Sequence, residues 1–299
     1  MNAIKTALIG LDTSHAVAFP QLMQDPATPV SERVPELRAV SCLRFETPFQ
    51  NRKGLDQRQA YLESIGVAVT ENFDEAVADC DAILLEINDP SLHLEYFRRA
   101  AELGKPIFLD KPFADTLDHS LEILRIAEEK KIRFFTSSAL RFDVDLEEAL
   151  KKGVRPESVS VWGPLGVAAS GSSLVWYGVH AFEMLERIMG RGAAMVEMIG
   201  GSRGGVAVVS YADGRSAAVE LRRGSSQYGA LIRDGDREPA LANVSGRIPF
   251  YAMLLRQIVR FIRDGVQPVD PLDSLEVMAM LDAAERSGVS GRAAAVSLR

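Results

Sequence analysis

The stretch DAILLEINDPSLHLEYFRRAAELGKPIFLDKP, residues 81–112, decides the fold class of this chain. It begins with a continuous apolar run at 82–87, continues with a helical pattern at 93–103 and ends in a second apolar run at 106–109. A strand that is apolar throughout, without alternation, is typical of a parallel sheet covered by helices on both faces. Gly104 follows the helical pattern, where a residue that ends a helix is expected. The stretch therefore predicts one β-α-β unit of a parallel sheet.

The same alternation continues on both sides of this unit. Further strands are expected at 4–10, 37–45, 67–70 and 132–136, and further helices at 14–23, 56–65, 73–78 and 117–129. Repeated β-α units of this size imply a doubly wound parallel sheet with right-handed crossovers. We therefore predict an α/β protein whose first domain, residues 1–139, is a Rossmann domain.

The pattern changes after residue 140. Strands are expected at 159–162, 206–211 and 216–221, and the turn containing Asp213 and Gly214 predicts a hairpin between the last two. Glycine- and serine-rich loops are expected at 163–173 and 222–235, and amphipathic helices at 250–263 and 273–287. Residues 140–299 are thus predicted to form an α+β domain with a largely antiparallel, open sheet.

Composition excludes several classes of protein. The 299 residues include 34 Lys+Arg and 41 Asp+Glu, and the net charge of −7 argues against a nucleic-acid partner. No apolar stretch approaches the ~20 residues of a membrane helix, and the run at 7–11 is too short for a signal peptide. Cys42 and Cys80, both in strand-like segments, are expected to be buried thiols of a cytoplasmic protein. No Cys/His spacing predicts a metal site.

The loop after the first strand, residues 10–15, reads GLDTSH where a dinucleotide-binding loop would read G-x-G-x-x-G. Gly10 matches the first glycine, whereas Asp12 and His15 occupy the second and third glycine positions. Thr13 and Ser14 are expected either to donate hydrogen bonds to a phosphate or simply to cap the helix. Asp12 would repel a phosphate if its side chain faced inward.

Arg44 follows the second strand, where NAD-binding proteins usually carry an acid that binds the ribose hydroxyls. It is expected either to pair with a 2′-phosphate, which slightly favours NADP over NAD, or to be an ordinary surface charge.

Two side chains suit catalysis. Lys111 follows a buried strand, so it emerges at the carboxyl edge of the sheet, and Pro112 holds it in an extended conformation. An ammonium group there can orient a hydroxyl or stabilise a developing alkoxide. His180 begins an apolar helix that runs to Ile188, and it is either a proton carrier or a packed core residue. His93 is expected to fix a loop–helix junction.

Several motifs in this order resemble the Gfo/Idh/MocA oxidoreductase family. They are DAI at 81–83, NDPSLH at 88–93, AELGKP at 101–106, DKP at 110–112, RF at 141–142 and the tail at 261–292. The family carries D-A-V, a P-N-x-x-H-like turn, A-L-x-A-G-K and E-K-P in the same order. The resemblance implies an NAD(P)-binding Rossmann domain and a second domain whose open sheet often forms dimers or tetramers.

The resemblance also implies roles for individual residues. Lys111 corresponds to the lysine of E-K-P and His180 to the histidine of D-x-G-x-H, which bracket the reacting hydroxyl. Cofactor contacts are implied for Gly10, Asp12, Thr13, Ser14, His15, Arg44, Glu86, Asn88, His93 and Asp110. Substrate contacts are implied for Lys111, Arg141, Trp176, Tyr177 and His180. Trp176 stands where the motif has its aspartate, and Asp110 replaces the glutamate.

The leading hypothesis is an NAD(P)-dependent oxidoreductase that transfers a hydride between nicotinamide and a small polyol, sugar or related carbonyl compound. The altered residues Asp12, His15 and Trp176 keep open a non-catalytic ligand-binding or sensor protein. A lyase or hydrolase that uses a tightly held nicotinamide transiently is the third hypothesis. In each case the expected partner is a small molecule, with a homodimer or homotetramer as the assembly.

Overall fold

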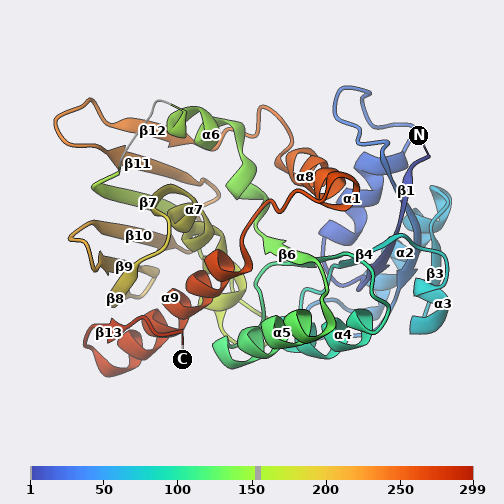
Figure 1. Ribbon diagram of the computed structural model, residues 1–299, viewed down its shortest axis with the longest axis horizontal. Helices are drawn as coiled ribbons and strands as arrows, with labels where there is room; N and C mark the ends of the chain where they lie inside the picture. Colours follow the sequence, from blue (N-terminus) through green and yellow to red (C-terminus); the bar gives the residue numbers. More distant parts are fainter. Residues whose placement is uncertain (1, 152–155, 299) are drawn as a thin grey trace. The chain divides into compact units, whose positions relative to one another are not determined.

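A computed structural model describes residues 2–151 and 156–298 and is drawn in Figure 1. The chain divides into two compact units, each assembled from two segments. The first unit combines Met1–Thr136 with Ile248–Pro271, and the second combines Ser137–Arg247 with Leu272–Arg299. Among the described residues, no helix is long and apolar enough to cross a membrane.

The first unit contains a six-stranded sheet in the order β3-β2-β1-β4-β5-β6. Its strands are β1 (Ile4–Ile9), β2 (Leu37–Leu43), β3 (Ala68–Thr70), β4 (Ala82–Leu85), β5 (Ile107–Asp110) and β6 (Phe134–Ser137). β1 pairs in parallel with both β2 and β4, and this is where the strand order reverses. Such a reversal creates the crevice in which doubly wound sheets bind ligands, outside the carboxyl ends of the strands.

Helices cover this sheet, which explains why its central strands are largely apolar. They are α1 (His15–Gln24), α2 (Arg52–Ser64), α3 (Phe73–Val77), α4 (His93–Ala101), α5 (Leu117–Lys130) and α8 (Phe250–Asp264), with a 3-10 turn η1 (Pro90–Leu92). Every residue of β4 and of β5 is buried. The predicted fold class is confirmed.

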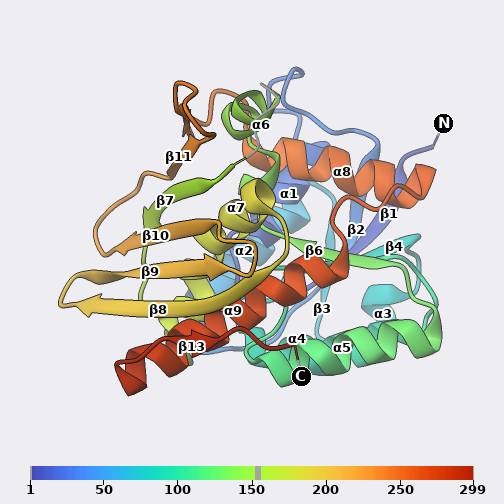
Figure 2. The same cartoon turned by 60° about the vertical axis from the view of Figure 1, so that its left-hand side comes forward.

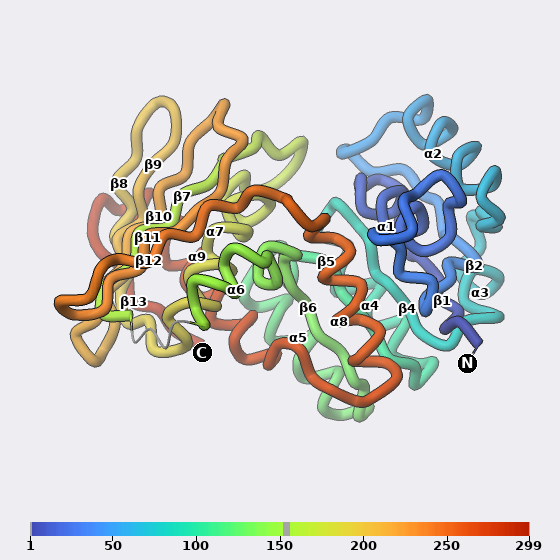
Figure 3. Tube along the Cα trace, turned by 90° about the horizontal axis from the view of Figure 1, so that it is seen from above, coloured from blue at the N-terminus to red at the C-terminus, as the bar shows by residue number. Residues whose placement is uncertain are grey.

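The second unit contains a seven-stranded sheet in the order β12-β11-β7-β10-β9-β8-β13. Its strands are β7 (Ser158–Pro164), β8 (Ala193–Gly201), β9 (Gly204–Tyr211), β10 (Ser216–Arg222), β11 (Gly229–Arg233), β12 (Ala240–Asn243) and β13 (Ala294–Ala295). Neighbours are antiparallel except β7 and β10. The predicted hairpin is confirmed as β9–β10, and Figure 3 shows β8 and β9 running side by side.

The remaining helical segments of the second unit are η2 (Ala139–Phe142), α6 (Val144–Leu150), η3 (Leu174–Gly178), α7 (Val179–Met189) and α9 (Pro271–Ser290). Of these, α7 packs on β7 and β10. Its buried side chains include Phe182, Met184 and Leu185, which supply the core of this unit.

The structure differs from the expected division of the chain at α8. This helix was expected within the second domain, yet it belongs to the first unit, where it contacts α1 (Figure 2). The physical reason is apolar packing, because the ring of Phe261 on α8 lies 5.1 Å from that of Phe135 and both are buried. The sequence pattern of a helix shows which of its faces is apolar, but it does not show which other element that face packs against.

Two local expectations were wrong. The loop expected at 222–235 contains β11, which pairs with β7 so that Gly229 lies opposite Trp162. A Cβ at Gly229 would come within 2.2 Å of the Trp162 ring, so the glycine that suggested a loop is needed inside the strand. Cys80 lies between α3 and β4 rather than in a strand, whereas Cys42 lies in β2. Both are buried free thiols, as expected.

Candidate functional site

Gly10 allows the ends of β1 and β4 to approach each other closely. Its φ of +109° lies in the region that favours glycine, and an added Cβ would meet the carbonyl oxygen of Glu86 at 2.5 Å. The glycine that matches the dinucleotide motif is therefore required by the packing of the strand ends. It places the following loop directly against the segment after β4.

Asp12 connects three loops at this edge of the sheet. Its carboxylate is 1% exposed and accepts hydrogen bonds from the backbone N–H of Asn88 at 2.9 Å and of Asp89 at 3.3 Å. The Thr47 hydroxyl donates a third bond at 2.8 Å. Burial raises the pKa of Asp12, and these hydrogen bonds act in the opposite direction. The second glycine position thus holds a carboxylate that is turned into the loop after β4.

The start of α1 bears on the alternative left open for Thr13 and Ser14. The Thr13 hydroxyl accepts the backbone N–H of His15, the first residue of α1, at 3.2 Å, although Thr13 lies one position before the N-cap residue Ser14. Ser14 is exposed and makes no side-chain capping bond. Its hydroxyl is consequently the one available to a ligand.

The His15 imidazole connects α1 with the ends of β4 and β5. Its Nδ1 lies 2.6 Å from Asp110 Oδ2 and 3.8 Å from Glu86 Oε2. The ring stacks on Phe19 with centroids 5.4 Å apart, and the edge of Tyr251 lies 4.8 Å away. The third glycine position is therefore filled by a fixed, buried imidazole.

Glu86, Asp110 and Lys111 are the other charged side chains of the group that contains His15. Glu86 is fully buried, and neither of its carboxylate oxygens has a hydrogen-bond partner among the described residues. Burial, together with the charge of Asp110, places the pKa of Glu86 well above its usual range. Burial would also raise the pKa of Asp110, but the attraction of His15 and Lys111 lowers it. Lys111 is buried and donates its backbone N–H to Asp110 Oδ1 at 2.8 Å.

Arg44 and His93, two further residues that were predicted to contact the cofactor, bind to other groups of the protein. Arg44 Nη1 bonds to Gln59 Oε1 and Nη2 to Asp56 Oδ1, each at 2.5 Å. His93 is fully buried, with its ring nitrogens 2.8 Å from the Ile87 carbonyl and 3.3 Å from the Phe113 carbonyl. His93 thus connects the loop after β4 with the segment after β5 through both ring nitrogens.

Sequence reasoning missed Arg58, which lies beside the altered loop. This α2 residue donates from Nη1 to the Leu11 carbonyl at 2.8 Å, and its charge interacts with Asp12. No motif marks it, because it is an ordinary arginine on a polar helix.

In the second unit, His180 is oriented by Ser138. The Ser138 Oγ lies 2.7 Å from His180 Nδ1, and the rings of Tyr177 and Tyr228 lie 5.3 and 5.8 Å from the imidazole, both edge-on. Trp176 packs on Tyr177 with centroids 5.2 Å apart. Aromatic rings therefore flank the His180 imidazole, and its hydrogen bond with the Ser138 hydroxyl fixes the orientation of the ring.

Arg141 has a different environment from the one expected for a substrate ligand. It is 4% exposed, and its Nη1 lies 3.2 Å from Glu183 Oε2 and 2.5 Å from Glu186 Oε2. Burial raises the pKa of Glu183 to about 7, although the charge of Arg141 opposes the rise. Arg141 is thus committed to an internal ion-pair group between η2 and α7.

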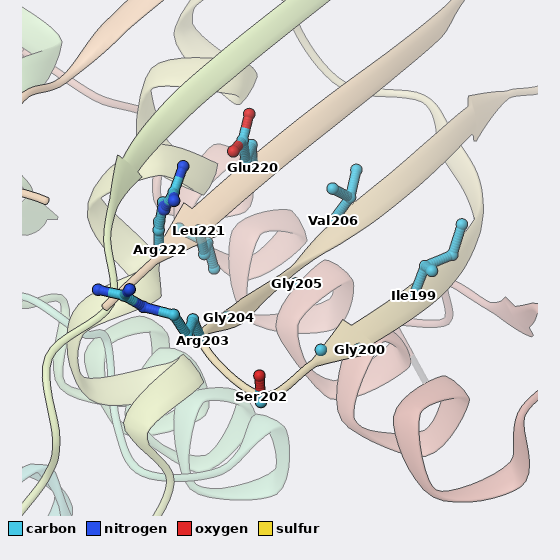
Figure 4. A pocket seen from close by; sticks show the side chains of 11 residues that line it. Ile199, Gly200, Ser202, Arg203, Gly204, Gly205, Val206, Glu220, Leu221 and Arg222 are labelled. Atoms are coloured by element: carbon cyan, nitrogen blue, oxygen red, sulfur yellow. The ribbon is translucent and has the colours of Figure 1, made fainter. Parts of the chain in front are cut away.

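A shallow hollow of about 390 Å³ lies on the second unit's sheet. It is lined by residues 199–206 and 220–222, at the ends of β8, β9 and β10. Figure 4 shows Arg203 and Arg222 at one end of this hollow and Ile199 at the other. None of the residues implied for cofactor or substrate lines it.

Comparisons with known proteins bear on the family. Residues 51–138 match the model of the oxidoreductase family with an NAD-binding Rossmann fold, Gfo/Idh/MocA. An uncharacterized oxidoreductase of Schizosaccharomyces pombe is 28% identical over 153 residues, 50% of this chain and 38% of the relative. The uncharacterized oxidoreductase YhhX of Escherichia coli is 27% identical over 136 residues, 41% of this chain and 39% of that protein. The matched region thus spans less than half the length of these relatives.

Solved structures show the same fold over nearly the whole chain. Myo-inositol 2-dehydrogenase from Lactobacillus plantarum superposes with a TM-score of 0.81 at 15% identity, covering 99% of this chain and 100% of the other. GenD2 from gentamicin A biosynthesis, solved in complex with NAD, gives 0.80 at 16% identity, covering 99% of this chain and 97% of the other. The order of motifs, the family match over residues 51–138 and the shared fold agree, and they show that the chain is similar to the Gfo/Idh/MocA oxidoreductase family.

Proposed function

We propose that this chain is an NAD(P)-dependent oxidoreductase that transfers a hydride between nicotinamide and a small polyol, sugar or related carbonyl compound. The observation that carries the proposal is the placement of Lys111. It follows β5 directly, at the carboxyl edge of a parallel sheet, where open α/β folds bind ligands. Its backbone is held by Asp110, and no described residue makes an ion pair or hydrogen bond with its ammonium group.

The residues at the altered loop fit a dinucleotide, although in an unusual form. Gly10 keeps the close approach of the strand ends, and the exposed Ser14 stands at the N-terminus of α1, where helices favour phosphates. Three hydrogen bonds stabilise the Asp12 carboxylate, and Arg58 adds positive charge beside the loop. We propose Gly10, Ser14 and Asp110 as cofactor contacts, with Arg58 as an added one.

Nicotinamide, when bound, supplies the acceptor or donor of the hydride. Lys111 would donate a hydrogen bond to the substrate oxygen and stabilise negative charge as it develops there. We propose His180 as the residue that exchanges the substrate proton, because Ser138 fixes its ring and the family resemblance assigns it that role. Trp176 and Tyr177 would then shape the substrate's surroundings.

The preference between NAD and NADP depends on Arg44. Asp56 and Gln59 already hold its guanidinium, so a 2′-phosphate would have to compete with a carboxylate for it. We therefore propose that NADH and NADPH bind with similar affinity. Titrating both cofactors into the protein and into Arg44→Ala checks this, since a loss confined to NADPH would show that Arg44 reads the phosphate.

Lys111→Ala provides the test of the proposed reaction. Purified protein is assayed with NAD and NADP against a panel of inositols, sugars and polyols, and cofactor binding is measured by titration. The variant is expected to lose at least 100-fold in turnover while it still binds cofactor. Lys130→Ala serves as the control, because Lys130 pairs with Glu102 on the surface. The absence of cofactor binding up to about 1 mM, the upper end of usual KM values, would overturn the proposal.

One observation favours a second candidate, a ligand-binding protein without turnover. The side chains of Asp12 and His15 are buried at positions that belong to the phosphate-binding glycine loop of a standard dinucleotide site. Turnover that depends on Lys111 would exclude this candidate, whereas tight binding of a sugar or polyol without any nicotinamide binding would support it.

We also propose that two or more copies associate through the sheet of the second unit. Met195, Ile199 and Leu241 are large apolar side chains exposed on β8 and β12. Light scattering after size exclusion should give a dimer or tetramer, and Ile199→Asp should give monomers. Leu103→Asp, at an exposed leucine of the first unit, is expected to leave the assembly unchanged.

A further inference from the structure

We propose that His15, Glu86 and Asp110 form a binding site for one divalent transition-metal ion, such as Mn²⁺, Fe²⁺ or Zn²⁺. Their candidate ligand atoms, one imidazole nitrogen and two carboxylate oxygens, all lie within 4.8 Å of one another. All three residues are buried. They come from the start of α1, the end of β4 and the end of β5, so three elements of the first unit contribute to the site.

Glu86 is the observation that points to a cation. Its side chain is fully buried, and both carboxylate oxygens lack a hydrogen-bond donor among the described residues. Buried carboxylates are normally paired, hydrogen-bonded or bound to a metal, because leaving one unpaired is costly. Glu86 Oε2 lies 3.8 Å from the His15 imidazole, and the charge of Lys111 also acts on this group, so the carboxylate that lacks a hydrogen-bond donor is directed into the cluster.

The spacing of the ligand atoms suits a small ion after a minor adjustment. Ligands that lie about 2.1 Å from a zinc-like ion are separated from one another by roughly 3 Å or more. The 3.8 Å separation of His15 Nδ1 and Glu86 Oε2 agrees with that range. His15 Nδ1 and Asp110 Oδ2 are 2.6 Å apart, so they would move apart by several tenths of an ångström as the ion replaces the shared proton.

The donor set also indicates the class of ion. Imidazole favours borderline transition metals, whereas carboxylates favour harder ions, so a mixed set suits Mn²⁺, Fe²⁺ or Zn²⁺ better than Ca²⁺. A divalent cation would neutralise both carboxylates in a region from which water is largely excluded. The ring of His15 is held by Phe19 and Tyr251, so the ligand is already oriented.

The experiment is a metal titration that needs no enzymatic turnover. The full chain is stripped with a chelator and titrated with Mn²⁺ alone, followed by electron paramagnetic resonance, and with Zn²⁺ alone, followed by calorimetry. We expect one site per chain and a rise in Tm with metal concentration, because only the folded state holds the three ligands together. Glu86→Gln, which keeps the side-chain size, should weaken binding at least tenfold. His15→Ala should do the same.

The chain offers a matched control on its surface. His119 Nδ1 lies 2.6 Å from Asp115 Oδ1, which reproduces the His15–Asp110 pair without a second carboxylate. His119→Ala should leave metal binding unchanged. Circular dichroism establishes that each variant is folded, and Glu86→Gln remains informative if His15→Ala does not fold.

Two outcomes would overturn the proposal. One is that neither ion binds at concentrations up to about 1 mM, and the other is that Glu86→Gln and His15→Ala bind as tightly as the unaltered chain. In the second case the ions would be adventitious, and the cluster would share protons instead of a metal. Both outcomes are read from metal binding alone, with neither cofactor nor substrate present, so they are distinguishable from failure of the proposed reaction.

Discussion

Asp12 occupies the loop position of the second glycine in the dinucleotide motif, and its carboxylate accepts hydrogen bonds from neighbouring loops. Replacing it with alanine would leave the part-buried backbone N–H of Asn88 and the buried one of Asp89 without this acceptor. We expect Asp12→Ala to lower the free energy of unfolding by about 2 kcal/mol, since each buried unpaired donor costs roughly 1–3 kcal/mol. Asp12→Asn keeps one acceptor oxygen and should lose less. Urea unfolding of the three proteins measures the difference, and equal midpoints would contradict the expectation.

Glu183 gives a residue-scale prediction about pH. Its pKa is raised to about 7 in the folded chain, above the usual 4.5, because the carboxyl is buried. The folded state therefore holds a proton that the unfolded state has released, so stability should fall as pH rises from about 4.5 to about 7. Glu183→Gln should flatten this dependence, as measured by urea unfolding at pH 5, 6, 7 and 8. A variant with an undiminished slope would show that another group is responsible.

The proposed metal site shows why part of the candidate site could not be predicted from the sequence alone. Lys111 could be predicted because it follows a recognisable strand, and its position at the strand end depends only on local pattern. His15, Glu86 and Asp110 lie on three separate elements, so no spacing along the chain brings them together. The sequence contains no local metal motif for this reason. Arg141 illustrates a related limit, because a motif position does not reveal its partners Glu183 and Glu186.

The junction between β1 and α1 provides a prediction at the scale of elements. Gly10→Ala would put a Cβ 2.5 Å from the Glu86 carbonyl oxygen in a backbone conformation that alanine disfavours. We expect it to reduce the free energy of unfolding by at least about 2 kcal/mol, from steric overlap and backbone strain together. Gly104→Ala is the matched control, because Gly104 has a φ of +65° with open space around it. It should cost only about 1 kcal/mol.

The central strands of the first unit were predictable because they are buried on both faces. β4 is apolar throughout and β5 is apolar up to Asp110, and that composition leaves few alternatives. In the second unit, β8, β11 and β12 are rich in glycine, alanine or polar residues, so their sequences resemble loops. They are strands because pairing within the sheet satisfies their backbone groups, and for β11 one of the pairing partners, β7, is distant in sequence.

At the scale of the molecule, α8 makes the first unit discontinuous. A fragment of residues 1–139 lacks this helix and would expose the buried surfaces of Phe19 and Phe135 that α8 covers. We expect the fragment to bind a hydrophobic dye and to unfold without a sharp transition. Joining residues 248–271 to its end through a flexible linker should restore cooperative unfolding, measured by circular dichroism. A fragment that is equally cooperative without them would refute this account.

The same discontinuity has a consequence for how the protein is made. Ribosomes release the chain from its N-terminus, so residues 137–247 emerge before α8 is available to close the first unit. Until then, the nascent Rossmann sheet carries an uncovered apolar surface beside α1. The newly made chain would be vulnerable to aggregation and a natural client of chaperones until synthesis has passed residue 271.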